Sequence, residues 1–221
     1  PIDYEDLREY YDINDKMMGV SGLPGDPYYP DIEDLLPLPP VQIGKIGNLM
    51  AKSFDELGWH WWPSYSSITS EEYKGRTRWY QNSVDATYLP IAKSNGVEIR
   101  SESRVLKITT NKKGKADGVI YSDLNNNYCK VSAAIIIVAC NGIGTPRLLL
   151  NSANKLFPNG LANSSGLVGK NLMLHPLGYV EGIFDQPLMS NYGPQGCCIF
   201  SHEFYETNSE VSFKRGYTMH V

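Results

Sequence analysis

The segment from Ile135 to Leu150, IIIVACNGIGTPRLLL, constrains the fold of this chain more than any other part of its sequence. It opens with four β-branched residues, Ile135 to Val138. Their lack of polar alternation predicts a strand that is buried on both faces of a sheet. Because this strand runs through a glycine-bearing loop toward a helix, the segment predicts an α/β architecture.

The residues after this strand predict a loop that opens a helix. Gly142 and Gly144 permit backbone angles and close approaches that a Cβ would block. Thr145 is a suitable N-cap and Pro146 fits the first helical position, so we expect the helix to start at or near Pro146. Unpaired amides of its first turn would face the carboxyl end of the strand, where open α/β sheets bind ligands. The same pattern also occurs where strand, turn and helix only pack together.

Two phosphate-binding motifs are incomplete in this region. The dinucleotide fingerprint requires a third glycine, and this chain has Arg147 there. The P-loop requires Ser or Thr after Gly-Lys, whereas Asn171 follows Gly169 and Lys170. We therefore expect no primary phosphate-binding loop here.

Size, charge and cysteine usage exclude several classes of protein. The chain has 221 residues, 42% of them hydrophobic, which is enough for one large domain or two smaller ones. Its formal net charge is -4 and its basic residues are scattered, which argues against nucleic acid as a partner. Four cysteines without C-x-x-C spacing predict free thiols and favour a reducing compartment. No apolar run reaches the length of a transmembrane segment, and the sequence leaves the localisation open.

Periodicity predicts three helices, a connector and an antiparallel insertion. The helices are expected at Tyr4–Met18 with Gly19 as its end, at Gly44–Leu57 with Gly58 as its end, and from near Ser83 with Pro90 in an early turn. Residues 22–40 hold six prolines and predict an extended crossing. Residues 97–138 predict strand, turn, strand, turn, strand.

Two segments together, residues 135–152 and 157–176, resemble the glucose-methanol-choline family of FAD-dependent alcohol oxidoreductases. In that family a strand, a small-residue loop and Gly-Thr-Pro lead into a helix. A segment of the form N-x-S-G-L-V-G-x-N-L-M-x-H-P follows, which runs here from Asn163 to Pro176. The upstream stretches YDINDKMMGVSG, PLPP and VDATYLP are similar to the branch that contains the large subunit of gluconate 2-dehydrogenase.

The resemblance implies an internal fragment of α/β class, α+β in part. It would hold part of an FAD/NAD(P)-binding-type sheet with an antiparallel β insertion, and the beginning of a substrate domain. Residues 1–82 would be a helical and proline-rich segment with cap and substrate-side elements. Residues 83–157 would be part of the FAD-binding domain, and residues 158–221 the linker and the start of the substrate domain.

The resemblance also implies a function. The whole protein would oxidise a CH–OH group of a sugar, sugar acid or polyol, with hydride transfer from the alcohol carbon to the N5 atom of FAD. A cytochrome or another electron acceptor would be its partner. The family's glycine fingerprint is expected before Pro1 and its catalytic histidine after Val221. No catalytic residue is therefore expected in this chain, and the fragment alone is expected to be inactive.

The same resemblance assigns cofactor-contacting residues. Val105 resembles the residue whose backbone meets the adenine, and the strand end resembles the part that runs beside the ADP moiety. The expected cofactor-contacting residues are Val105, Ala139, Cys140, Asn141, Gly142 and Thr145. No metal site is expected, because the cysteines and His202 lack zinc-type spacing. His60, which lies among tryptophans, fits either a sugar-stacking surface or a buried aromatic cluster, and the cluster is favoured.

Two departures from the family pattern keep alternatives open. Cys140, Asn141 and Gly142 stand where the family usually has Ala-Gly-Ala. Only residues 77–82 stand where branch members carry a longer, cysteine-containing stretch. The chain could therefore be a truncated or degenerate non-catalytic remnant of this fold. A different two-dinucleotide-type flavoprotein is the other alternative.

Overall fold

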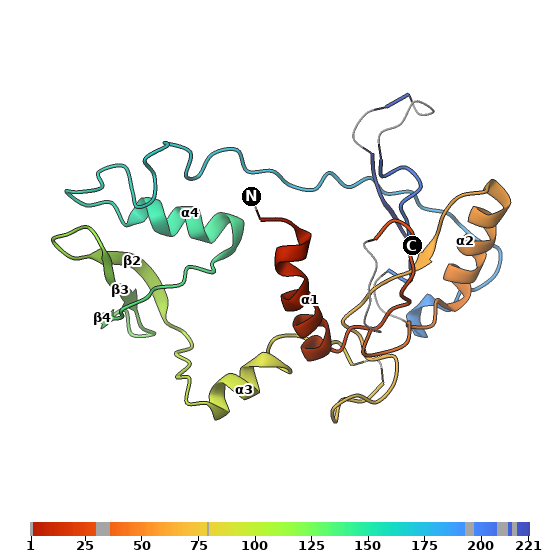
Figure 1. The fold of residues 1–221 in the computed structure, drawn as a ribbon, viewed down its shortest axis with the longest axis horizontal. Coiled ribbons are helices and arrows are strands. Elements are labelled where there is room, and N and C mark those ends of the chain that lie inside the picture. Colours follow the sequence, from red (N-terminus) through yellow and green to blue (C-terminus); the bar gives the residue numbers. More distant parts are fainter. Residues whose placement is uncertain (1, 30–35, 79, 193–196, 207–211, 214–215) are drawn as a thin grey trace. The chain divides into compact units, whose positions relative to one another are not determined.

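The computed structural model describes residues 2–29, 36–78, 80–192, 197–206, 212–213 and 216–221. The chain divides into two compact units, unit 1 with residues 1–97 and 182–221, and unit 2 with residues 98–181. Each unit contains a three-stranded antiparallel sheet, in the order β1-β5-β6 in unit 1 and β2-β3-β4 in unit 2 (Figure 1). The class is thus mixed α and β.

The elements have the following bounds. The helices are α1 (Tyr4–Met18), α2 (Gly44–Leu57), α3 (Tyr88–Ser94) and α4 (Asn141–Asn151), with a 3-10 turn η1 at Ser190–Tyr192. The strands are β1 (Trp62–Pro63), β2 (Arg104–Thr110), β3 (Ala116–Ser122), β4 (Tyr128–Ser132), β5 (Ile199–Ser201) and β6 (Met219–His220).

The predicted bounds of the first two helices are confirmed. Asp3 caps α1 by accepting a hydrogen bond from the Asp6 amide, and the Asp6 carboxylate accepts one from the Asp3 amide. Gly19 ends α1 in the left-handed conformation, at φ 68°, and Gly58 ends α2 in the same way at φ 69°. Both ends follow from local chemistry, which is why the sequence predicted them.

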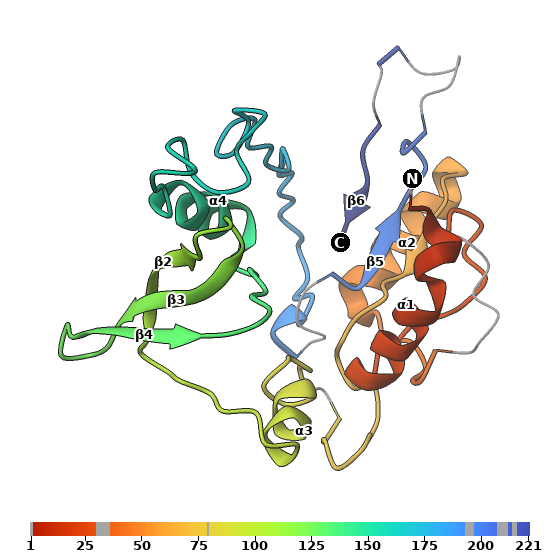
Figure 2. The same cartoon turned by 60° about the vertical axis from the view of Figure 1, so that its left-hand side comes forward.

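The core of unit 1 forms where α2 packs on its sheet. Ala51 and Phe54 from α2 contact Cys198 and Ile199, all four of them buried. Gly47 permits the close approach, since a Cβ there would lie 3.0 Å from the Cys198 sulfur. Figure 2 shows α2 beside β5.

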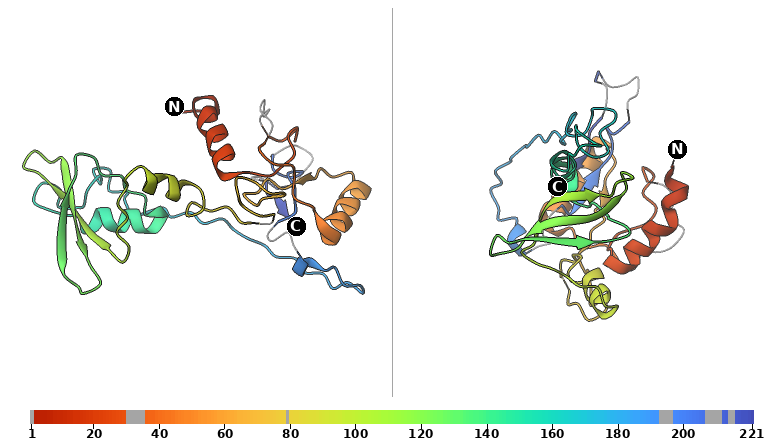
Figure 3. Two further views of the ribbon diagram at one scale, coloured as in Figure 1. Left: turned by 90° about the horizontal axis from the view of Figure 1, so that it is seen from below. Right: turned by 90° about the vertical axis from the view of Figure 1, so that its left-hand side faces the viewer.

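Unit 2 is an antiparallel sheet with α4 packed along it (Figures 2 and 3). Ile108 on β2 faces Val119 on β3, and Val119 faces Val131 on β4. Ile108 also packs with Leu148 and Leu161 in a small buried cluster. The predicted antiparallel insertion is confirmed by β2, β3 and β4.

The buried strand predicted at Ile135 to Val138 is wrong. Ile136 and Val138 pack against the cluster around Ile108, but Ile135 and Ile137 are 80% and 86% exposed. No strand of the described residues pairs with this segment. The segment is covered on one side only. Successive side chains of an extended chain point to opposite sides, so Ile136 and Val138 share the covered side and Ile135 and Ile137 the exposed one.

Two predicted helix starts are also wrong. The helix expected from Pro146 begins at Asn141, with Pro146 inside its second turn. The helix expected from Ser83 begins at Tyr88, after a turn in which the Ala86 amide donates to the Ser83 carbonyl. Pro90 explains the late start, since proline fits the first turn of a helix better than its interior.

Among the residues that the structure describes, no helix combines the length and the apolar character that crossing a membrane requires.

Replacing Gly19 by Ala is expected to lower the free energy of unfolding by about 2–4 kcal/mol. The new Cβ would sit in a left-handed conformation and would lie 2.7 Å from the Tyr73 ring. All four tryptophans belong to unit 1, so urea unfolding followed by tryptophan fluorescence measures this loss.

Gly58→Ala is the matched control, because Gly58 has the same left-handed φ but no atom within 4 Å of an added Cβ. We expect a loss of only about 1 kcal/mol there. Equal losses for the two variants would contradict the close packing of Gly19 against Tyr73.

Candidate functional site

The stretch Ala139–Thr145, here called the strand-end stretch, joins the extended segment to α4. Asn141 adopts a left-handed φ of 57°, which asparagine tolerates better than most residues. Its side-chain oxygen accepts hydrogen bonds from the amides of Ile143, at 3.1 Å, and Gly144, at 3.3 Å. Asn141 therefore acts as the side-chain cap of α4, the role that the sequence had assigned to Thr145.

Thr145 closes the loop instead of capping the helix. Its Oγ1 accepts a hydrogen bond from the Cys140 amide at 3.1 Å. The amides of Cys140, Ile143 and Gly144 are thus satisfied within the stretch.

The remaining surface of the strand-end stretch is exposed and uncharged. Ala139, Cys140, Asn141 and Gly142 are all exposed, and residues 139–146 carry no charged side chain. An added Cβ at Gly142 would meet nothing closer than Leu172 Cδ1 at 3.9 Å, so a planar group can approach the backbone there.

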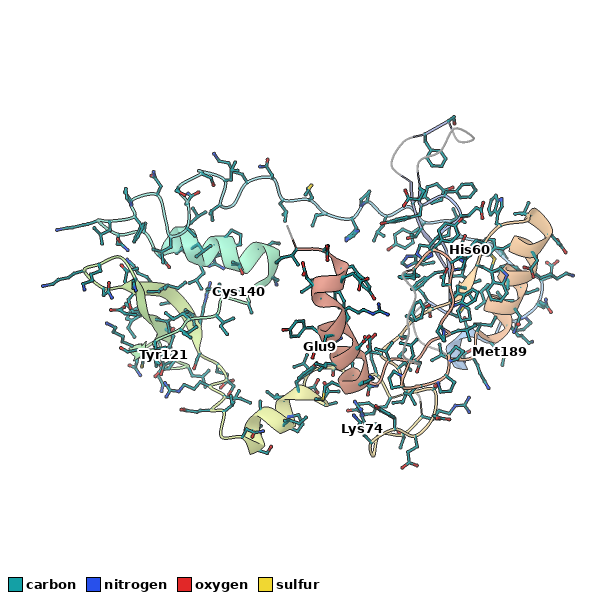
Figure 4. All side chains as sticks on the ribbon, viewed as in Figure 1. Glu9, His60, Lys74, Tyr121, Cys140 and Met189 are labelled. Carbon is teal, nitrogen blue, oxygen red and sulfur yellow. The ribbon has the colours of Figure 1, made fainter. Side chains whose placement is uncertain are left out.

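Val105, the other expected cofactor residue, lies in unit 2 on β2, opposite Tyr121 on β3. Its side chain is partly exposed, and the pairing of β2 shifts register between Val105 and Lys107. Such an irregularity bends the strand locally and changes the direction of its side chains. The structure thus places Val105 in the sheet and the strand-end stretch at the N-terminus of α4 (Figures 2 and 4).

The sequence segment Asn163–Pro176 divides into two parts. Asn163 Oδ1 accepts from the Val168 amide at 3.1 Å, and Gly166 and Gly169 take left-handed φ values of 69° and 80°. This explains the asparagine and the two glycines of the first part as requirements of a compact loop. Residues 171–176 are exposed and belong to no helix or strand.

Unit 2 also holds an apolar cavity of about 270 Å³. Its walls include Ile108, Val138 and Phe157, and none of its lining residues is titratable. The Thr110 hydroxyl is the polar side chain among its lining residues.

Unit 1 contains a buried histidine cluster, defined here as Asp26, His60 and His202. The His60 Nε2 atom lies 3.0 Å from Asp26 Oδ1, and these side chains are 11% and 1% exposed. The His202 amide donates to His60 Nδ1 at 3.3 Å. Aromatic rings surround the cluster, with Tyr28 4.5 Å from His60 between ring centroids (Figure 4). The expectation that His60 belongs to a buried aromatic cluster is confirmed.

The sequence could not reveal this cluster, because its members are far apart in the chain. Two of its buried polar atoms, Asp26 Oδ2 and His202 Nδ1, lack a hydrogen-bond partner among the described residues, whereas His60 Nε2 faces Asp26 Oδ1. Among the described residues, however, no three His, Cys, Asp or Glu side chains converge to hold a metal ion. All four cysteines are free, in agreement with the sequence prediction.

Several known proteins are similar to this chain in sequence. The family described as GMC oxidoreductase matches residues 44–177. The chain is 41% identical over 236 residues to the 2-methyl-1,2-propanediol dehydrogenase of Mycolicibacterium austroafricanum, covering 100% of this chain and 43% of that protein. It is 29% identical over 189 residues to the fructose dehydrogenase large subunit of Gluconobacter japonicus, covering 79% and 35%.

A third relative, the gluconate 2-dehydrogenase flavoprotein of Pantoea cypripedii, is 23% identical over 224 residues, covering 86% of this chain and 36% of the relative. The chain thus spans about two fifths or less of the length of these curated relatives.

Replacing Asn141 by Ala is expected to destabilise the start of α4 by about 1–2 kcal/mol, because two amides lose their acceptor. Asn141→Asp is the matched control, since its carboxylate keeps an acceptor for both amides and aspartate also tolerates the left-handed backbone. Hydrogen exchange of the amides at 143–146 measures both effects. Equal exchange in the two variants would contradict the capping role.

Burial lowers the pKa of His202 from its ordinary value of 6.5. The charge of Asp26 raises this pKa, and the charges of His60 and His220 lower it further. The unfolded chain therefore binds this proton at a higher pH than the folded chain. The free energy of unfolding of unit 1 should fall as the pH drops below about 6.5.

His202→Phe is expected to flatten this pH dependence between about pH 7 and about pH 5, as followed by tryptophan fluorescence. His175→Gln is the control, because His175 is exposed and belongs to unit 2. An unchanged slope in the His202 variant would show that another group carries the dependence.

Proposed function

Since the chain belongs to the GMC oxidoreductase family, we propose that it is part of an FAD-dependent oxidoreductase that oxidises CH–OH groups of a sugar, sugar acid or polyol. The dehydrogenases and oxidases among its relatives are named for a diol, fructose, gluconate and paromamine. Each of these names denotes a small polyhydroxylated compound or an amino sugar. A substrate of the same chemical class is therefore the simplest proposal for the protein that carries this chain.

One observation supports the proposal that this chain contacts FAD. The strand-end stretch exposes uncharged backbone at Ala139 to Gly142 and is held rigid by its own hydrogen bonds. Rigid exposed backbone can contact adenosine without the entropic cost of ordering long side chains. We propose that Ala139, Cys140, Asn141 and Gly142 contact the ADP part of FAD.

Two further residues complete the proposed contact set. Val105 would offer its backbone at the irregular start of β2. Thr145 would act indirectly, because its hydroxyl fixes the Cys140 amide. Neither residue carries a charge, and the pyrophosphate of the cofactor would be held by other parts of the protein.

Bound FAD would supply the hydride acceptor, and the residues of this chain would bind and orient it. The base that removes the hydroxyl proton is proposed to lie outside this chain. The proposed domain division keeps residues 83–157 on the cofactor side, with residues 1–82 and 158–221 contributing cap, linker and substrate-side elements. A cytochrome-type electron acceptor is the proposed partner, as the resemblance in sequence implies.

The described residues of the short junction 77–82 pack through buried polar groups. Thr69 is fully buried, and its Oγ1 accepts from the Tyr80 amide at 2.8 Å. Asn82 is buried, and its side chain donates to the Gly19 carbonyl at 3.4 Å. A non-catalytic remnant of the same fold would keep this packing, so flavin binding is the property that separates it from the proposed enzyme.

The cofactor contact can be tested at Gly142. The protein carrying this chain should copurify with a flavin, seen by its visible absorption bands. Gly142→Val is expected to lower the flavin content per polypeptide at least about fivefold, because a branched side chain would cover the exposed backbone. Its thermal stability should be unchanged, since space is available for the side chain.

Gly178→Val is the matched control, because Gly178 is equally open and is not proposed to contact the cofactor. Its flavin content should stay at the wild-type level. Full flavin content in the Gly142 variant would refute the proposed contact, and a colourless wild-type protein that takes up no FAD would refute the proposed function.

A further inference from the structure

A thiol and an imidazole meet at the edge of the β1-β5-β6 sheet. The Cys197 sulfur lies 3.6 Å from His220 Nδ1, and the other ring nitrogen, Nε2, lies 2.9 Å from Thr218 Oγ1. In the tautomer whose Nε2–H donates to Thr218, Nδ1 carries a free lone pair directed at the thiol. This order of nucleophile, base and orienting group is the one that activates side chains for attack.

The backbone around the pair is held firmly by the sheet. The buried Ser64 hydroxyl donates to the Cys197 carbonyl at 2.6 Å, and the Ser64 amide donates to the Cys198 carbonyl at 3.1 Å. Phe200 packs against the His220 ring, with centroids 4.5 Å apart. These contacts hold Cys197, which lies two residues before β5, close to His220 in β6.

The other three cysteines lack this arrangement. Cys198 is 3% exposed, and burial raises the pKa of its thiol. Cys129 and Cys140 have no recorded contact between their thiols and an imidazole among the described residues. Cys197 is half-buried and His220 exposed, so a small reagent can reach the sulfur.

We propose that Cys197 is a modification site, a thiol activated by His220 that forms a mixed disulfide with small-molecule disulfides. His220 Nδ1 takes the thiol proton while the Cys197 sulfur attacks one sulfur of the disulfide. A new S–S bond forms, the old one breaks, and the leaving thiolate takes the proton back from His220. Cys197 is oxidised and the leaving half of the reagent is reduced, so atoms and electrons balance.

The test uses an aromatic disulfide, dithiobis(nitrobenzoate), on the native protein that carries this chain. Peptide mass spectrometry then gives the modification rate of each cysteine in the same sample. His220→Gln is expected to slow modification of Cys197 about tenfold or more, because the base is lost. The rate at Cys129, a half-buried free thiol on β4 with no proposed cofactor contact, serves as the internal control and should not change.

A second variant keeps the test decisive if His220→Gln is poorly folded. Thr218→Val keeps the side-chain shape and removes only the group that orients the imidazole, whereas Thr218→Ser retains it. We expect a lower ratio of Cys197 to Cys129 modification in the valine variant and a normal ratio in the serine variant. An unmodified Cys197 in the native protein, or ratios unaffected by these changes, would overturn the proposal.

Discussion

The attachment of α4 to β2 is the interaction on which the candidate cofactor site depends. Ser152, at the end of α4, is fully buried, and its hydroxyl donates to the Leu148 carbonyl and accepts from the Ile108 amide at 2.9 Å. Lys107 Nζ adds a bond to the Ala153 carbonyl at 2.9 Å. Together with the packing of Leu148 on Ile108, these contacts fix the helix against the sheet. The strand-end stretch at the opposite end of α4 is positioned by this attachment.

The sequence predicted those features that depend on local chemistry. The bounds of α1 and α2 followed from periodicity and from the glycines at their ends, and the three strands of unit 2 followed from alternating apolar residues and turn residues. The family resemblance also followed from short motifs, and the match to residues 44–177 supports it. Each of these signals lies within about a dozen neighbouring residues, so no knowledge of distant contacts was needed.

Features that depend on distant residues were missed or wrong. The apolar run at 135–138 indicates burial on both sides, but the contacts that cover one side come from Ile108 and Leu161, and the other side stays exposed. Thr145 and Asn141 are both suitable caps by residue type, and only the backbone geometry decides that Asn141 has the role. The cluster of Asp26, His60 and His202 joins three separate parts of the chain, which no local pattern encodes.

The central claim is that the strand-end stretch of unit 2 contacts the nucleotide part of a flavin. Hydrogen exchange, compared between the flavin-loaded protein and the same protein after flavin removal, measures this directly. The account predicts protection of amides within residues 139–144 in the loaded protein, with little change in β4. Equal exchange of residues 139–144 in both states, with protection confined to other segments, would contradict it.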